Sequence, residues 1–200
     1  MQKEKIILKL KLPTDPLWVK NVVESNIQEI LSDHAFCEQK AASNAITLIV
    51  QNPNLPDLVQ KMAGLVQEEM DHFKRVHDII IERGYELGRE RKDHYVNELM
   101  QFMIKGGGRQ QQLIDRLLLS AMIEARSCER FKVMSEHIND SQLADFYYEL
   151  MVSEAGHYAM FLKLAKQYAG DIDVDKRWNE LLTYEASVIQ NYGKTERIHG

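Results

Sequence analysis

The 200-residue sequence predicts an all-α fold, a four-helix bundle with additional peripheral helices. Apolar residues recur at helical spacing over long segments, and only 4 Pro and 10 Gly interrupt the chain. No two segments show the alternation of a strand pair or the pattern of a βαβ unit. With 44% hydrophobic residues, the chain is expected to form a single domain, 1–200, around a sizeable core.

Helix caps and turn residues divide the chain into segments. Asp15-Pro16 predicts a helix start, with Asp as the N-cap and Pro at the first helical position, so short helices are expected over 16–30. Residues 6–12 alternate weakly between apolar and polar and are expected to be extended. Ser32 and Asp33 are expected to cap the first long helix. The bundle core is expected at about 33–170, and the predicted helices are 33–51, 56–83, 91–104, 110–138, 140–169 and 174–191.

A repeated motif is the most informative feature of the chain. Glu38 lies 31 positions before a Glu-x-x-His sequence, and Glu124 lies 30 positions before a second one. Residues three apart lie on one face of a helix, so the Glu and His of each motif can reach the same metal ion. Four ionised Glu side chains balance the charge of two divalent ions. The predicted ligands of this dinuclear site in the bundle core are Glu38, Glu69, His72, Glu124, Glu154 and His157.

Chance does not explain the motif well. Random placement of Glu and His predicts about 0.6 Glu-x-x-His matches in this composition, and three occur. The third, Glu196 to His199, lies in a polar C-terminal segment and is expected to be accidental. The alternative interpretation is that the other two motifs are solvent-facing pairs on exposed helices.

Two further predictions concern the ligands and the metal of this site. Glu124 rather than Glu129 is the expected ligand, because Glu129 lies only 25 positions before Glu154 and about 140° further round the helix. The mixed oxygen and nitrogen donors suit iron, with manganese as the alternative metal. Cys37 and Cys128 form no Cys-x-x-Cys motif, which excludes rubredoxin-type and zinc-ribbon sites, and both are expected to be reduced, buried fillers.

The segment between the two halves is rich in basic residues. The chain has a net charge of −5, so binding of nucleic acid would require such a local patch. Acidic residues are interspersed, and the alternative is a solvated charged face. Four aspartates are candidate hydrogen-bond partners of the ligand histidines: Asp33, Asp71, Asp115 and Asp145. The candidate substrate-binding residues are Arg83, Arg89, Arg91, Lys92, Lys105 and Arg109.

Residues 33–42 and 123–131 resemble the bacterial tRNA hydroxylases that act on 2-methylthio-N6-isopentenyladenosine, within the ferritin-like di-iron carboxylate superfamily. The resemblance implies a ferritin-like fold and a non-haem di-iron monooxygenase that hydroxylates the isopentenyl group of the modified adenosine beside the anticodon. It also implies two iron ions, dioxygen as co-substrate, tRNA as partner and a separate electron-donating reductase. The six predicted ligands match the metal positions of the family, and no other catalytic residue is implied.

Three other functions are compatible with the residues. They are an iron-storage or ferroxidase protein, a rubrerythrin-like or manganese-dependent protein that handles peroxide, and a helical interaction protein without metal. The N-terminal apolar run is too short for a signal peptide, and no segment reaches transmembrane length free of charge. The protein is therefore expected to be cytoplasmic, without membrane contact, and to be a monomer or small homo-oligomer.

Overall fold

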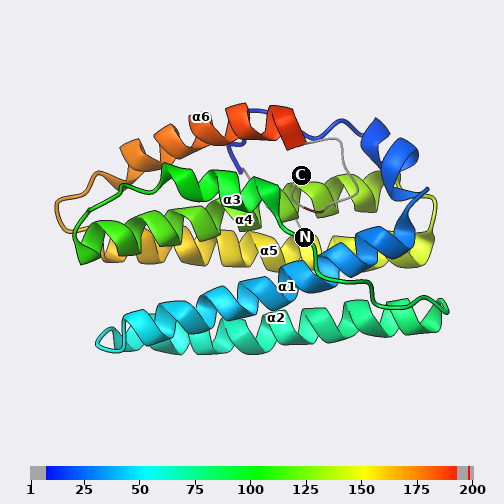
Figure 1. The fold of residues 1–200 in the computed structure, drawn as a ribbon, viewed down its shortest axis with the longest axis horizontal. Coiled ribbons are helices and arrows are strands. Elements are labelled where there is room, and N and C mark those ends of the chain that lie inside the picture. The colour runs from blue at the N-terminus through cyan, green and yellow to red at the C-terminus, as the bar shows by residue number, and fades with distance from the viewer. Residues whose placement is uncertain (1–7, 193–197, 199–200) are drawn as a thin grey trace, which may run out of the picture. The chain divides into compact units, whose positions relative to one another are not determined.

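The computed structural model describes residues 8–192 and 198, and these residues form helices and loops without a strand (Figure 1). They divide into two compact units, one built on 23–92 and the other on 8–22 and 93–192. Residues 6 and 7 of the predicted extended segment and the third Glu-x-x-His lie outside the described residues. Within the described ranges, no helix is both long and apolar enough to cross a membrane.

The unit built on 23–92 is a helical hairpin. Helix α1 (Ile27–Gln51) packs along α2 (Pro56–Glu82), and a short turn joins them. Gly84 follows α2 with φ of 70°, a left-handed conformation that glycine adopts without strain, and this turns the chain away from the helix. Most of the facing positions are apolar, and the apolar residues buried on the two helices include Ile30, Leu31, Ala35, Ala42, Leu48, Leu58, Met62, Leu65, Val76 and Ile80.

The first long helix begins six residues earlier than predicted, at Ile27. Ser32 and Asp33 lie inside it, so their predicted capping role is wrong. The Ser32 hydroxyl accepts a hydrogen bond from the Gly88 N–H at 3.0 Å, and the Asp33 carboxylate accepts one from the Ile198 N–H at 2.8 Å. These side chains resemble caps in the sequence, but they hold segments that are distant in the chain, a use that local pattern does not reveal.

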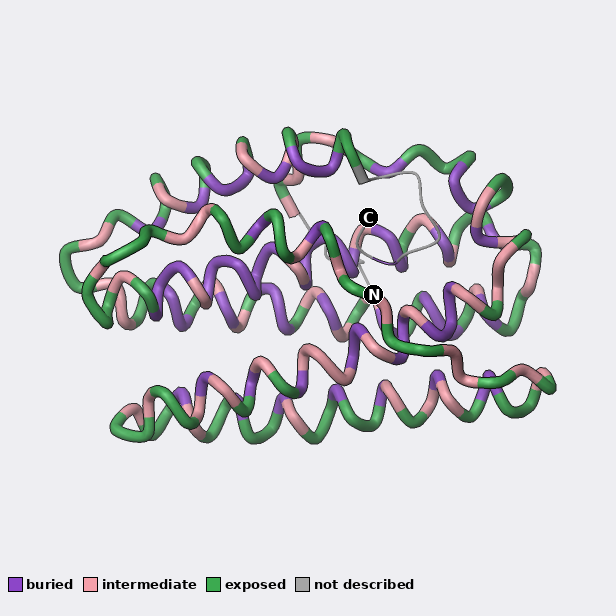
Figure 2. Tube along the Cα trace, viewed as in Figure 1, coloured by how far each residue is buried: buried purple, intermediate pink, exposed green. Residues whose placement is uncertain are grey.

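The second unit is built around another hairpin. It consists of α4 (Arg109–His137) and α5 (Ser141–Gln167). The short helix α3 (His94–Leu99) packs against α6 (Val174–Tyr192), and α6 also contacts α4. Asp93 and Asp140 cap α3 and α5 by accepting hydrogen bonds from the backbone N–H groups three residues on, at 2.9 and 3.0 Å. Figure 2 shows buried positions along nearly the whole of α4. Two short elements complete the described helices: η1 (Val19–Val23) precedes α1, and η2 (Met100–Phe102) follows α3.

Most predicted helix boundaries agree with the structure to within two residues. The helix predicted at 91–104 is shorter, because α3 and η2 together cover only 94–102. In the 16–30 segment, a short π-helix forms at Val19–Val23. The Asp15 carboxylate accepts a hydrogen bond from the Leu17 N–H at 2.9 Å, as the predicted helix start requires.

A buried ionic network joins four segments of the second unit. Arg126 of α4 is fully buried and donates from Nε and Nη2 to Glu185 Oε1, at 3.1 and 2.6 Å. It also donates to Glu129 and to the Leu12 carbonyl, at 2.9 and 3.1 Å. The Tyr95 hydroxyl donates to the same Glu185 oxygen at 3.0 Å, and burial together with the Glu185 charge raises the pKa of Tyr95 well above its usual value. The network fixes α6, α3 and the N-terminal segment to α4.

Candidate metal centre

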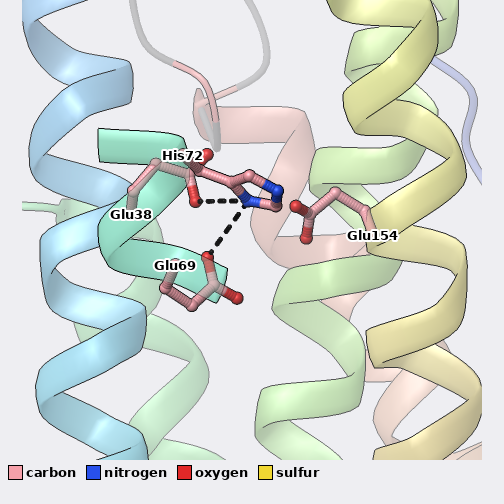
Figure 3. A group of neighbouring side chains, drawn as sticks. All are labelled: Glu38, Glu69, His72 and Glu154. Atoms are coloured by element: carbon pink, nitrogen blue, oxygen red, sulfur yellow. Dashed lines mark ion pairs between the residues drawn. The ribbon is translucent and has the colours of Figure 1, made fainter. Parts of the chain in front are cut away.

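The α1–α2 hairpin holds three of the predicted ligands. Glu38 extends from α1, and Glu69 and His72 extend from α2, with exposed fractions of 5%, 0% and 5%. His72 Nδ1 lies 3.7 Å from an oxygen of Glu38 and 3.7 Å from an oxygen of Glu69, and Figure 3 shows the three side chains pointing toward one another. These separations are too long for hydrogen bonds and suit ligands that bind one ion at about 2.0–2.2 Å each.

A fourth buried residue orients this group. His34 lies one turn before Glu38 on α1, has no exposed surface, and places its Nε2 2.6 Å from Glu38 Oε1. The other Glu38 oxygen, Oε2, is the one that faces His72. The signal that could have identified His34 is its position four residues before a predicted ligand.

The α4–α5 hairpin holds the other three predicted ligands. Glu124 extends from α4, and Glu154 and His157 extend from α5, and all three are buried. His157 Nδ1 lies 3.5 Å from a Glu154 oxygen. Cys128 donates to the Met151 carbonyl at 3.3 Å, and burial, assisted by the charge of Glu154, raises the pKa of this thiol to about 12. The thiol is therefore protonated at neutral pH, as expected for a buried filler.

Glu129, the alternative to Glu124, has other partners. One of its oxygens accepts from the Thr14 N–H, and the other accepts from the Thr14 hydroxyl, both at 2.7 Å. Arg126 donates to the second oxygen as well. This arrangement supports Glu124 over Glu129, although the ligand role itself remains a prediction.

The four candidate aspartates have other positions or partners. Asp33 binds the backbone near the C-terminus, as described above, and Asp115 pairs with Arg177 at 2.9 Å. Asp71 and Asp145 are exposed. The aromatic residues near the ligands mostly pack in the core: Phe131 lies against Tyr147 and Tyr158 against Trp178, while Phe73 lies beside His77 and both Phe36 and Phe73 are half-buried.

The predicted substrate-binding residues are divided between the two units. Those at 83–92 belong to the α1–α2 unit, whereas Lys105 and Arg109 belong to the other. Arg91 forms an ion pair with Glu29, and the Lys40 ammonium pairs with Glu90 and donates to the Arg91 carbonyl. Part of the basic segment thus stabilises its own unit. The exposed members of the predicted set are Arg89, Lys92, Lys105 and Arg109.

The donor set of each hairpin fits a metal centre of the predicted kind. Each hairpin offers two carboxylates and one imidazole, and no thiolate is among the predicted ligands. Oxygen and nitrogen donors of this type suit iron and manganese. Two helical hairpins that each bury one Glu and one Glu-x-x-His set define a ferritin-like carboxylate protein.

Comparison with known proteins identifies the family. The model of the family described as tRNA-(MS[2]IO[6]A)-hydroxylase (MiaE) matches residues 2–200, and the chain belongs to that family. A Pseudomonas putida protein named tRNA 2-(methylsulfanyl)-N(6)-isopentenyladenosine(37) hydroxylase is 34% identical, over 95% of this chain and 91% of its own. A Salmonella typhimurium protein with the same name is 26% identical, over 95% of this chain and 87% of its own.

A solved structure confirms the predicted fold class. It is described as Protein 43 with aldehyde deformylating oxygenase activity from Synechococcus, and it matches with a TM-score of 0.87 and 31% identity, over 96% of this chain and 95% of that one. The fold is therefore all-α and ferritin-like, and the expectation of an oxygenase-family enzyme is confirmed.

Proposed function

We propose that this protein is an oxygen-dependent monooxygenase that hydroxylates the isopentenyl group of 2-methylthio-N6-isopentenyladenosine in tRNA. The observation that carries the proposal is the duplicated, buried Glu and Glu-x-x-His set in a chain that belongs to the hydroxylase family over residues 2–200. Fold alone would not set the substrate, because a protein of the same fold has aldehyde deformylating oxygenase activity.

We further propose that the two hairpins contribute to one dinuclear iron centre. The charge of four buried carboxylates supports this, because ionised groups in a protein interior are costly unless cations or donors compensate them. Two bound ferrous ions would supply the electrons that activate dioxygen toward a C–H bond. The six proposed ligands are Glu38, Glu69, His72, Glu124, Glu154 and His157.

The surrounding residues orient the ligands and exclude water. His34 Nε2 holds one oxygen of Glu38, which leaves the other oxygen directed at His72. Apolar side chains fill the interiors of the α1–α2 and α4–α5 hairpins. Exclusion of water protects a reactive centre from side reactions. An electron-donating reductase is expected as partner, and the cytoplasm is the expected location because the substrate is tRNA.

The other functions considered have less support. Iron storage and peroxide handling are compatible with a ferritin-like fold, but both curated relatives are named as tRNA hydroxylases. Manganese remains the alternative metal, since the donor set accepts either ion.

Turnover with labelled dioxygen tests the function. Iron-loaded protein with a reductant should add one oxygen atom to the modified nucleoside in tRNA from a strain that lacks this hydroxylase. Mass spectrometry of digested nucleosides should show that the atom comes from dioxygen. Absence of conversion by protein that contains its full iron would overturn the proposal.

Iron analysis tests the centre separately from activity. We expect two irons per chain, and iron-soaked crystals should show two ions about 3–4 Å apart between the six ligands. A single ion, or ions bound elsewhere, would contradict the dinuclear centre even in an active protein.

Replacement of His34 tests its role as a positioning residue. His34→Phe should weaken iron binding about 10–100-fold, because Glu38 loses the donor that orients it. His34→Gln retains an N–H donor and should recover much of the affinity. The measurement is an iron titration of the metal-free protein, with its melting temperature as control. Wild-type iron affinity in His34→Phe would show that His34 serves packing alone.

A further inference from the structure

The α4–α5 unit carries a cluster of cations where α4 begins and α5 ends. Arg177 lies there and is paired with Asp115 and Glu180. Six further basic residues lie at this end; five of them are exposed, and Arg116 is half-buried. This basic end consists of Lys105, Arg109, Arg116, Lys163, Lys166 and Lys176.

Hydrogen bonds bring these segments of the chain together. Gln110 of α4 donates to the Tyr168 carbonyl at the end of α5, at 3.0 Å. Arg177 of α6 pairs with Asp115 of α4 and donates to the Phe102 carbonyl at 2.8 Å. Figure 1 shows the loop before α4 and the loop after α5 at the same end of this unit. Each basic residue lies within a few positions of one of these contacts.

Acidic residues at this end compensate only part of the charge. Asp115 is 1% exposed and is neutralised by Arg177, and Asp175 pairs with Lys166 at 2.7 Å. Asp171 and Asp173 are exposed on the loop before α6. Cations therefore remain in excess on the α4 and α5 side of the cluster.

Two other regions of the surface are acidic. The opposite end of the α4–α5 hairpin carries Lys132 against Glu136, Asp140, Asp145 and Glu149. On α2, two exposed lysines stand against exposed Asp57, Glu68, Asp71, Asp78 and Glu82. In a chain of net charge −5, these regions repel a polyanion, whereas the basic end attracts one.

We propose that the basic end binds phosphates of the tRNA backbone and so positions the modified adenosine for hydroxylation. This inference rests on the proposed function. Arg116 precedes Glu124 by eight residues, about 12 Å along the helix, and Lys163 follows His157 by six, about 9 Å. A nucleotide whose phosphate is held there can extend its unstacked base and isopentenyl group along the hairpin toward these ligands.

The proposal changes the assignment of the basic segment. Lys105 and Arg109 remain phosphate contacts, and Arg116, Lys163, Lys166 and Lys176 join them. Arg91, which pairs with Glu29, serves its own unit instead.

A charge-neutralising variant tests the basic end. The probe is tRNA from a strain that lacks the hydroxylase, and affinity is measured against salt concentration with the iron-loaded protein. The test variant combines three exposed replacements, Lys105→Gln, Arg109→Gln and Lys163→Gln. It should bind tRNA about tenfold or more weakly. The slope of log affinity against log salt concentration should fall by about two to three in magnitude, because fewer phosphate contacts form and fewer counterions are released on binding. The KM for tRNA should rise while kcat at saturation holds.

A matched variant controls for net charge. Lys20→Gln, Lys61→Gln and Lys132→Gln remove the same charge from exposed positions elsewhere and should leave the slope nearly unchanged. Equal losses in both variants, or unchanged affinity in the first, would overturn the proposal. So would a larger loss in Arg89→Gln with Lys92→Gln, which would place the contact at 83–92. If the test variant turns over more slowly but binds tRNA with unchanged affinity, the basic end binds an acidic protein partner rather than tRNA. Failure of the proposed function is distinguishable, because binding is measured without turnover.

Discussion

Glu124→Ala should lose iron and activity, whereas Glu129→Ala should keep both. Glu124 is buried and lies about 140° round the helix from Glu129. It lies 30 positions before Glu154, close to the 31 positions by which Glu38 precedes Glu69. Glu129 instead accepts hydrogen bonds from Thr14 and Arg126. Iron in Glu124→Ala should fall from two ions per chain to one or fewer. Activity should fall by more than about a hundredfold, because losing a metal ligand costs more than losing a residue that hydrogen-bonds to a ligand.

In the metal-free state the order of stability should be the reverse: Glu129→Ala should be the less stable of the two variants. Glu129→Ala removes the acceptor of three hydrogen bonds and should lower the free energy of unfolding by about 1–3 kcal/mol. Metal analysis, turnover and urea unfolding of the metal-free proteins measure the three quantities. Loss of iron in Glu129→Ala together with two irons in Glu124→Ala would show that the alignment of the repeat is wrong.

The repeat made the candidate site predictable because it combines two periodicities. A separation of three residues places Glu69 and His72 on one helical face, and the similar spacing in the second half indicates a duplicated hairpin. The long helices were predictable for a related reason: turn residues such as Gly84 and Pro56 interrupt continuous apolar periodicity, and the structure places the helix ends there.

The features that the sequence did not predict depend on contacts between distant residues. Ser32 and Asp33 have the chemistry of caps, yet their partners lie 56 and 165 positions away. Arg126 and Glu185 look like exposed charges, but they meet in the interior across 59 positions. Neither propensity nor periodicity carries information on such pairs, because each partner is an ordinary polar residue in its own segment.

Arg126→Met should be the most destabilising substitution outside the metal centre. Glu185 has no exposed surface, and Arg126 donates to it from two nitrogens. Burial lowers the pKa of Arg126, but the neighbouring Tyr95, Glu185 and Glu129 outweigh this and raise it above the usual value, so the guanidinium stays charged. Removal of the cation leaves a buried carboxylate without its main counter-charge, which costs about 3–5 kcal/mol.

A second replacement separates the cost of the orphaned charge from the value of the pair. Arg126→Met combined with Glu185→Leu removes both charges and should recover much of the loss, because an apolar pair of similar volume is often as stable as a buried ion pair. Lys74→Met is the control: its partner Asp78 is exposed, and the free energy of unfolding should not change measurably. Urea unfolding of the iron-free proteins gives the comparison. If Arg126→Met unfolds at the same urea concentration as Lys74→Met, the network does not hold α6 and the N-terminal segment on α4. If the double variant is no more stable than Arg126→Met, the lost energy lies in packing around the guanidinium rather than in the charge left on Glu185.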